Sequence, residues 1–108
     1  MIKRILLSGL MLAGPPCLLK AEELGDRTRG LEYAKKNCAS CHSVSPHEGQ
    51  SIVSDAPDFV SVANTPGMTP TAIAVWLQTP HPNMPNFVIP ESDIDDLAAY
   101  ITSLKKPK

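Results

Sequence analysis

The sequence predicts an all-α fold of three to four helices joined by long loops. Apolar residues recur at helical spacing in separate segments, and no segment shows the alternating apolar pattern of a β-strand. Prolines and glycines interrupt the chain between these segments, and there is no internal repeat. With 108 residues, 43% of them hydrophobic, the chain forms a single small domain. Domains of this size commonly need a disulfide, a metal or a cofactor for stability.

Residues 1–21 have the pattern of a secretory signal peptide, because Lys3 and Arg4 precede an apolar run that extends to Leu19. A membrane span is the alternative, but a spanning helix needs about 20 apolar residues and two prolines interrupt this run. We therefore expect an exported chain that is cleaved at the end of this segment and keeps no membrane span. The mature domain is then residues 22–108, located in the periplasm.

The mature domain is acidic, because three of the ten basic residues lie in the signal segment. It carries 7 Lys and Arg residues against 11 Asp and Glu residues, a net charge of about −4. Nucleic-acid binding would require a basic face that contacts phosphates. The composition therefore argues against nucleic acid and favours a protein partner.

Apolar spacing locates the first helix, and a capping pattern locates the next. One is predicted from Asp26 to the cysteine motif at Cys38, with its lysines facing outward. The next follows Thr69, a hydroxyl N-cap with proline at the first helical position, and ends before Pro80. We expect this middle helix to be short.

The C-terminal segment predicts the last helix, which begins at Pro90. Its apolar stripe comprises Ile94, Leu97, Ala98, Ile101 and Leu104. Acidic residues at its start and Lys105 and Lys106 at its end suit the helix dipole.

Two segments between the helices are predicted to be loops. Residues 43–69 contain several prolines and glycines, and only the stretch 59–63 is apolar enough for one helical turn. A loop of this length in a small domain is unusual unless it wraps a group that supplies packing surface. Residues 79–87 contain three prolines and are expected to form a stiff, extended strap.

The segment Cys38-Ala39-Ser40-Cys41-His42 matches the Cys-x-x-Cys-His pattern of c-type haem attachment. In this pattern the two thiols bond to the vinyl groups of haem, and the histidine that follows lies beneath the iron. One covalently attached haem c, with iron that cycles between Fe(II) and Fe(III), is therefore the expected cofactor.

Three other sites use similar residues. Zinc needs four tetrahedral ligands, and the remaining histidines, His47 and His81, lie in proline-rich loops where we expect them to be exposed. A thioredoxin-like dithiol requires a preceding strand, which the pattern lacks. A simple disulfide between Cys38 and Cys41 suits an exported protein but leaves His42 unexplained.

The sixth iron ligand is less directly indicated by the sequence. The candidates are Met68, Met84, His47 and His81. Met84 is favoured because Pro82 and Pro85 hold its loop extended, so the thioether can be placed at the iron without a helix. Met68 precedes a helix cap, where we expect it to fill an apolar gap in the loop.

Several segments together resemble class I c-type cytochromes, and in particular small bacterial monohaem cytochromes c. The matching segments, within a core of about residues 30–104, are Gly30, Cys38-x-x-Cys41-His42, Ala56-Pro57-Asp58-Phe59, Trp76, Pro82-x-Met84-Pro85 and Asp96-Leu97-Ala98-Ala99-Tyr100-Ile101. The resemblance implies a small cytochrome c-like fold, with its helices and long loops wrapped around one haem.

The resemblance also implies roles for residues around the haem. The terminal helices would cross near Gly30 and Tyr100, where glycine permits close backbone approach. The carbonyl of Pro57 would accept the ring N–H of His42. Phe59 and Leu77 would line the haem face, and Trp76 would either direct its indole N–H to a propionate or pack in the core.

Ligation by His42 and Met84 would leave no open position on the iron, so we expect an electron-transfer protein rather than an enzyme. The expected partners are redox proteins, a donor and an acceptor, that dock transiently at the exposed haem edge of a monomer. Two alternatives stay open: a haem subunit of a periplasmic dehydrogenase or oxidase complex, and a haem sensor or peroxidatic domain with an open iron site.

Overall fold

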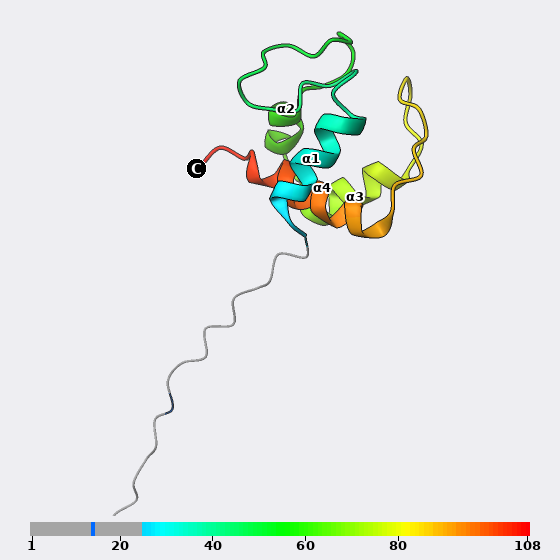
Figure 1. Cartoon of the computed structure of the whole chain (residues 1–108). Coiled ribbons are helices and arrows are strands. Elements are labelled where there is room, and N and C mark those ends of the chain that lie inside the picture. Colours follow the sequence, from blue (N-terminus) through cyan, green and yellow to red (C-terminus); the bar gives the residue numbers. More distant parts are fainter. Residues whose placement is uncertain (1–13, 15–24) are drawn as a thin grey trace, which may run out of the picture.

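The computed structural model describes Gly14 and residues 25–108, and the segment predicted to direct export lies almost entirely outside them. The described part contains four α-helices and no strand (Figure 1), so the predicted all-α fold is confirmed. The helices are α1 (Arg27–Asn37), α2 (Phe59–Asn64), α3 (Pro70–Gln78) and α4 (Glu91–Ser103).

Helix α1 begins and ends where the sequence predicts. The side chain of Asp26 caps it by accepting a hydrogen bond from the backbone N–H of Arg29 at 2.9 Å. At the other end, the N–H of Cys38 donates to the carbonyl of Ala34 at 2.8 Å. The first cysteine of the motif is therefore the C-cap residue of α1, so the helix fixes where the motif starts.

Helix α3 also follows its predicted pattern, because the hydroxyl of Thr69 accepts a hydrogen bond from the N–H of Ala72 at 3.1 Å. Helix α4 starts after Pro90 without a side-chain cap and ends at Ser103. Lys105 and Lys106 lie beyond that end. They directly follow the C-cap residue Leu104, and the N–H of Lys105 donates to the carbonyl of Thr102 at 3.2 Å.

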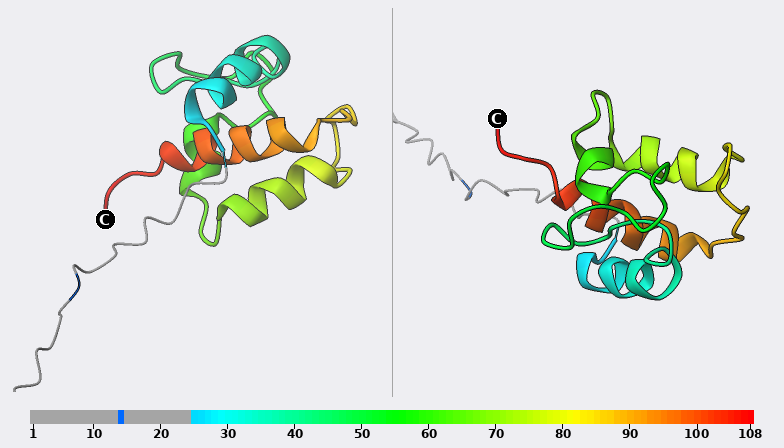
Figure 2. Two further views of the ribbon diagram at one scale, coloured as in Figure 1. Left: turned by 60° about the horizontal axis from the view of Figure 1, so that its bottom comes forward. Right: turned by 90° about the horizontal axis from the view of Figure 1, so that it is seen from above.

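Helices α1 and α4 cross at close range beside Gly30 (Figure 2). A Cβ atom at this position would overlap the backbone carbonyl of Asp96 and lie 2.7 Å from the Cβ of Tyr100. Only glycine allows the two backbones to approach in this way. The carboxylate of Asp96, 3% exposed, also binds α1 through Arg29, whose Nε lies 2.7 Å from its Oδ2.

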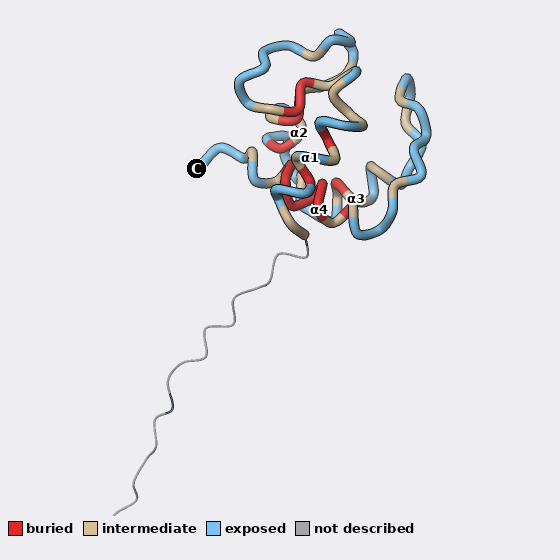
Figure 3. Tube along the Cα trace, in the orientation of Figure 1, coloured by how far each residue is buried: buried red, intermediate tan, exposed pale blue. Residues whose placement is uncertain are grey.

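The buried core runs along α4, against which α2 and α3 also pack. Its cluster comprises Ala34, Val44, Phe59, Ala63, Ile73, Leu97, Ala98, Tyr100 and Ile101. Figure 3 shows that burial concentrates on the helices, whereas the segment between α1 and α2 and the strap between α3 and α4 are mostly exposed. No helix within the described residues is both long and apolar enough to cross a membrane.

Candidate haem site

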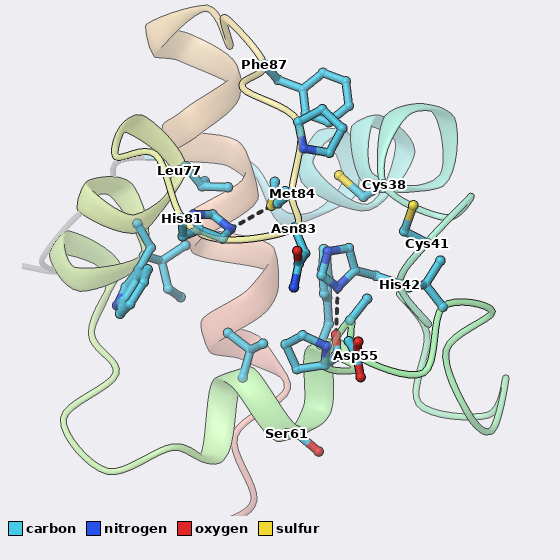
Figure 4. A pocket seen from close by; sticks show the side chains of 18 of the residues that line it. Cys38, Cys41, His42, Asp55, Ser61, Leu77, His81, Asn83, Met84 and Phe87 are labelled. Carbon is cyan, nitrogen blue, oxygen red and sulfur yellow. Dashed lines mark hydrogen bonds between the residues drawn. The ribbon is translucent and has the colours of Figure 1, made fainter.

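A cavity of about 590 Å³ lies between the cysteine motif, α2, α3 and the strap (Figure 4). This volume is within the range of small-molecule and cofactor pockets. Predicted site residues that line it are Cys38, Cys41, His42, Pro57, Phe59, Trp76, Leu77 and Met84. The chain thus brings together residues that are widely separated in the sequence.

The cysteine motif forms a tight turn that continues from α1. The N–H of His42 donates to the carbonyl of Cys38 at 2.9 Å, and the N–H of Cys41 donates to the same oxygen at 3.2 Å. Both cysteines are free thiols of intermediate burial. The turn therefore presents two thiols and one imidazole to the same cavity from five consecutive residues.

The environment of Cys38 does not favour a redox dithiol. Burial, and then the proximity of Cys41, raises the pKa of the Cys38 thiol to about 11, whereas redox dithiols are activated by a lowered thiol pKa. Among the described residues, no group of three or more His, Cys, Asp or Glu side chains is placed to bind a metal.

The imidazole of His42 has a defined orientation. Its Nδ1 lies 2.7 Å from the carbonyl oxygen of Pro57. Because a carbonyl can only accept, Nδ1 carries the proton, and the lone pair of Nε2 is free to bind a metal. The ring also packs at a tilt against Phe59, with centroids 5.4 Å apart.

Helix α2 holds this orienting carbonyl in place. The side chain of Asp58 caps α2 by accepting hydrogen bonds from Ser61, at 2.9 Å from its N–H and 2.6 Å from its hydroxyl. These bonds lower the pKa of Asp58 below its ordinary value. The N–H of Phe59 donates to the carbonyl of Ser43 at 2.9 Å, which joins α2 to the residue after His42.

The strap brings Met84 to the cavity, where its side chain lies beside His81 (Figure 4). The turn before it is tight, because Asn83 adopts a left-handed conformation with φ of 65°. This conformation is more accessible to asparagine than to most other residues. His42 and Met84 therefore line the same apolar space, although they come from different segments.

His81 does not occupy the exposed position that the sequence suggested. It is partly buried, lines the cavity, and places Nε2 2.7 Å from the Sδ of Met84. Its Nδ1 lies 3.0 Å from the carbonyl of Thr79. The prediction failed because the strap turns back on itself between Thr79 and Met84. The other loop histidine, His47, is exposed.

Three further candidates differ in their packing. Trp76 is 54% exposed and makes an edge contact with His81, so it lies at the cavity rim and not in the buried core. Leu77 and Met68 are partly buried against the core and line the cavity. The expected role of Met68 as apolar filler in its loop agrees with this packing.

One supporting contact was not predicted from the sequence. The hydroxyl of Tyr100, 6% exposed, donates to the carbonyl of Val44 at 2.5 Å. This bond ties α4 to the chain two residues after His42. The Ala-Tyr-Ile segment on a predicted helix indicates that Tyr100 packs against its neighbours. The segment does not indicate which loop carbonyl accepts the hydrogen bond from the Tyr100 hydroxyl.

The cavity fits a haem in volume, in its largely apolar lining, and in the two thiols and one oriented imidazole at its wall. The family model described as cytochrome c oxidase, cbb3-type, subunit III matches residues 25–101. The chain belongs to this cytochrome family. It is also similar to cytochrome c-552 of Bradyrhizobium diazoefficiens, with 43% identity over 81 residues that cover 74% of this chain and 76% of that protein. No solved structure matches.

Membership confirms that the chain is a c-type cytochrome that carries haem c. It is an electron-transfer protein and not an enzyme. The resemblance inferred from the spacing of the motifs therefore identified the right family.

Proposed function

We propose that this cytochrome is an exported, monomeric one-electron carrier that moves electrons between redox proteins of the periplasm. The observation that carries the proposal is that His42 and Met84, from separate segments of the chain, both line one cavity. His42 is oriented by Pro57 with its Nε2 free, and Met84 stands on the proline-framed strap. These two side chains would bind the haem iron.

The protein residues have separable roles in this proposal. Cys38 and Cys41 hold the haem covalently, and the Pro57 carbonyl orients His42 and strengthens it as a donor. Haem supplies the Fe(II)/Fe(III) couple. A methionine ligand such as Met84 raises the reduction potential, and the apolar wall disfavours the extra positive charge of the ferric state.

Ligation on both faces explains why electron transfer is the function that fits best. With His42 and Met84 both bound, the iron has no position for oxygen, peroxide or another substrate. A partner need only approach the haem edge, so a small interface with rapid release is sufficient. The domain proposed for this role is residues 22–108, with export directed by residues 1–21.

Attachment is tested by denaturing the purified protein. The wild type should keep its haem in denaturant and acid, whereas a Cys38→Ala, Cys41→Ala double variant should release it. A wild type that loses its haem on denaturation would refute covalent attachment through these thiols.

The sixth ligand is tested by the absorption spectrum of the ferric protein. Met84→Ala should abolish the methionine-to-iron charge-transfer band, whereas the matched control Met68→Ala should keep it. His81→Ala distinguishes the neighbouring imidazole, because it should leave the band in place if the thioether is the ligand. A wild type without this band, with a bis-histidine spectrum that depends on His81, would reassign the ligand.

A fixed haem subunit is the second candidate, and the match to a model described as an oxidase subunit favours it. The two candidates differ in solution behaviour. A free carrier should be recovered as a monomer from the periplasmic fraction, whereas a subunit should co-purify in constant ratio with membrane proteins. A reduced protein whose spectrum changes on addition of carbon monoxide would instead indicate a sensor or peroxidatic site with an open iron position.

A further inference from the structure

The charges of this chain are divided between segments in an uneven way. From Asn37 to Leu104 there is no lysine or arginine, although the same stretch contains seven Asp and Glu residues. This stretch includes all of the residues that line the cavity. Every basic residue of the described chain lies either in the segment 27–36 or in the tail 105–108.

The basic residues therefore do not reach the cavity wall. Arg29 is on the α4 side of α1, where its guanidinium binds Asp96. Lys35 and Lys36 are exposed on the last turn of α1 and do not line the cavity. A patch formed by these lysines would therefore lie outside the cavity wall.

The cavity wall itself carries one charged side chain, that of Asp55, which is exposed. Haem brings two propionate carboxylates to such a cavity, and no lysine or arginine in the wall offsets their charge. Asp58 stands beside the same wall, and its hydrogen bonds with Ser61 keep its pKa low. The charge around the loaded site is therefore negative.

Exposed apolar side chains flank this negative region on both sides. Ile52 is 79% exposed next to Val53, and Val88 is 99% exposed next to Phe87. Val53 and Phe87 both line the cavity. Apolar contacts surrounded by charge are the usual composition of a protein docking surface.

We propose that residues 52–58 and 85–88, called the cavity face from here on, form the docking surface for a redox protein that presents lysines and arginines around an apolar centre. This inference rests on the proposed electron-carrier function and specifies the charge of its partner. Attraction between opposite charges speeds encounter and orients the partner, while the apolar side chains supply short-range contact. An acidic partner would be repelled at this face.

The charge of the cavity face can be measured with two small redox reagents on the haem-loaded protein. Electron transfer with a cationic cobalt complex should slow by about tenfold as salt rises from about 0.01 M to about 0.5 M, because salt screens attraction. Transfer with an anionic iron complex should become faster over the same range. The proposal would be overturned if the two rates changed with salt in the opposite directions, or if neither rate depended on salt.

Matched charge variants assign the effect to one face. Asp55→Asn should slow the cationic reagent by about twofold at low salt, whereas Glu32→Gln on the outer surface of α1 should change the rate little. Equal effects of the two variants would mean that only the net charge matters, which would refute a localised docking face. Failure of both reagents to oxidise or reduce the protein would instead refute the carrier function itself.

A binding measurement separates recognition from electron transfer. Hexalysine titrated into isotope-labelled, reduced protein should shift the amide signals of the non-proline residues in 52–58 and 85–88. It should leave those of α1 unchanged, and the shifts should be lost in high salt. Shifts confined to the acidic start of α4, or no shifts, would contradict the proposed face.

Discussion

At the crossing of α1 and α4, backbone lies against backbone beside Gly30, whereas around the cavity α2, α3 and the strap meet through side chains that surround an internal space. The crossing is specified by the chain itself, through a missing Cβ and a buried carboxylate. The cavity side needs the cofactor to complete its packing. The same small domain therefore contains one region determined by amino-acid shape and one determined by a prosthetic group.

The largest expected effect comes from adding a methyl group at the crossing. Gly30→Ala should lower the free energy of unfolding by about 3 kcal/mol or more, because the new Cβ meets the backbone of α4. Denaturant titration of the haem-loaded protein measures the free energy of unfolding. The control is Gly49→Ala, in a loop where a Cβ meets open space and only the left-handed φ of 76° costs about 1 kcal/mol. Equal losses of unfolding free energy in the two variants would contradict a specific requirement for glycine at the helix crossing.

The next effect concerns the buried carboxylate. Asp96→Asn should cost about 2 kcal/mol at neutral pH, because it weakens the charged hydrogen bonds to Arg29 and to the N–H of Asp26. The hydrogen bond with Arg29 chiefly lowers the pKa of Asp96 in the folded state. Its contribution is therefore complete above the unfolded value of about 3.9 and is lost as the pH falls through the lower folded value.

Unfolding midpoints between acid and neutral pH test this prediction. The wild type should lose stability below about pH 4, and Asp96→Asn should show a smaller loss over that range. Asp55→Asn, at an exposed carboxylate, should keep the acid dependence of the wild type. If the stability of Asp96→Asn depended on acid pH as that of the wild type does, protonation of Asp96 would not be coupled to unfolding.

A smaller effect is expected where α4 holds the loop after the haem motif. Tyr100→Phe should cost about 1 kcal/mol, because the carbonyl of Val44 loses its donor. Tyr33→Phe, which leaves this bond intact, is the matched control. Amide hydrogen exchange should show reduced protection at residues 43–45 before protection falls in α4. A loss of protection spread evenly over the domain would show that the hydrogen bond does not act locally.

The smallest effect is expected on the strap. Val88→Ser should change the free energy of unfolding by less than about 0.5 kcal/mol, because Val88 is 99% exposed. The same substitution at the fully buried Val44 should cost about 2 kcal/mol. Thermal unfolding compares the two variants. A large loss at Val88 would show that the strap contributes more packing than its exposure indicates.

Local rules predicted much of the fold. Asp26 and Thr69 act as helix caps because each short side chain can reach an N–H three residues ahead, and such a contact can be inferred from adjacent residues. The approach of α1 and α4 at Gly30 followed from the family resemblance. The motif at Cys38 marked the cofactor, because its chemistry is contained within five residues.

Contacts between distant segments could not be predicted from the same rules. The bond between the hydroxyl of Tyr100 and the carbonyl of Val44 joins residues 56 positions apart, and neither segment specifies the other. His81 was expected to be exposed because nothing nearby in the sequence specifies how the strap turns. The pairing of Arg29 with Asp96 joins residues at opposite ends of the domain, and charge patterns along the chain do not identify such partners.

The position of Cys38 as the C-cap of α1 makes the haem-attachment turn a largely local structure. The hydrogen bonds that arrange Cys38, Cys41 and His42 lie within residues 34–42, apart from the bond of His42 to Pro57 and the bond from the N–H of Val53 to the carbonyl of Cys41. None of these bonds involves α3, α4 or the strap. The turn that presents the two thiols is therefore specified by the N-terminal half of the domain.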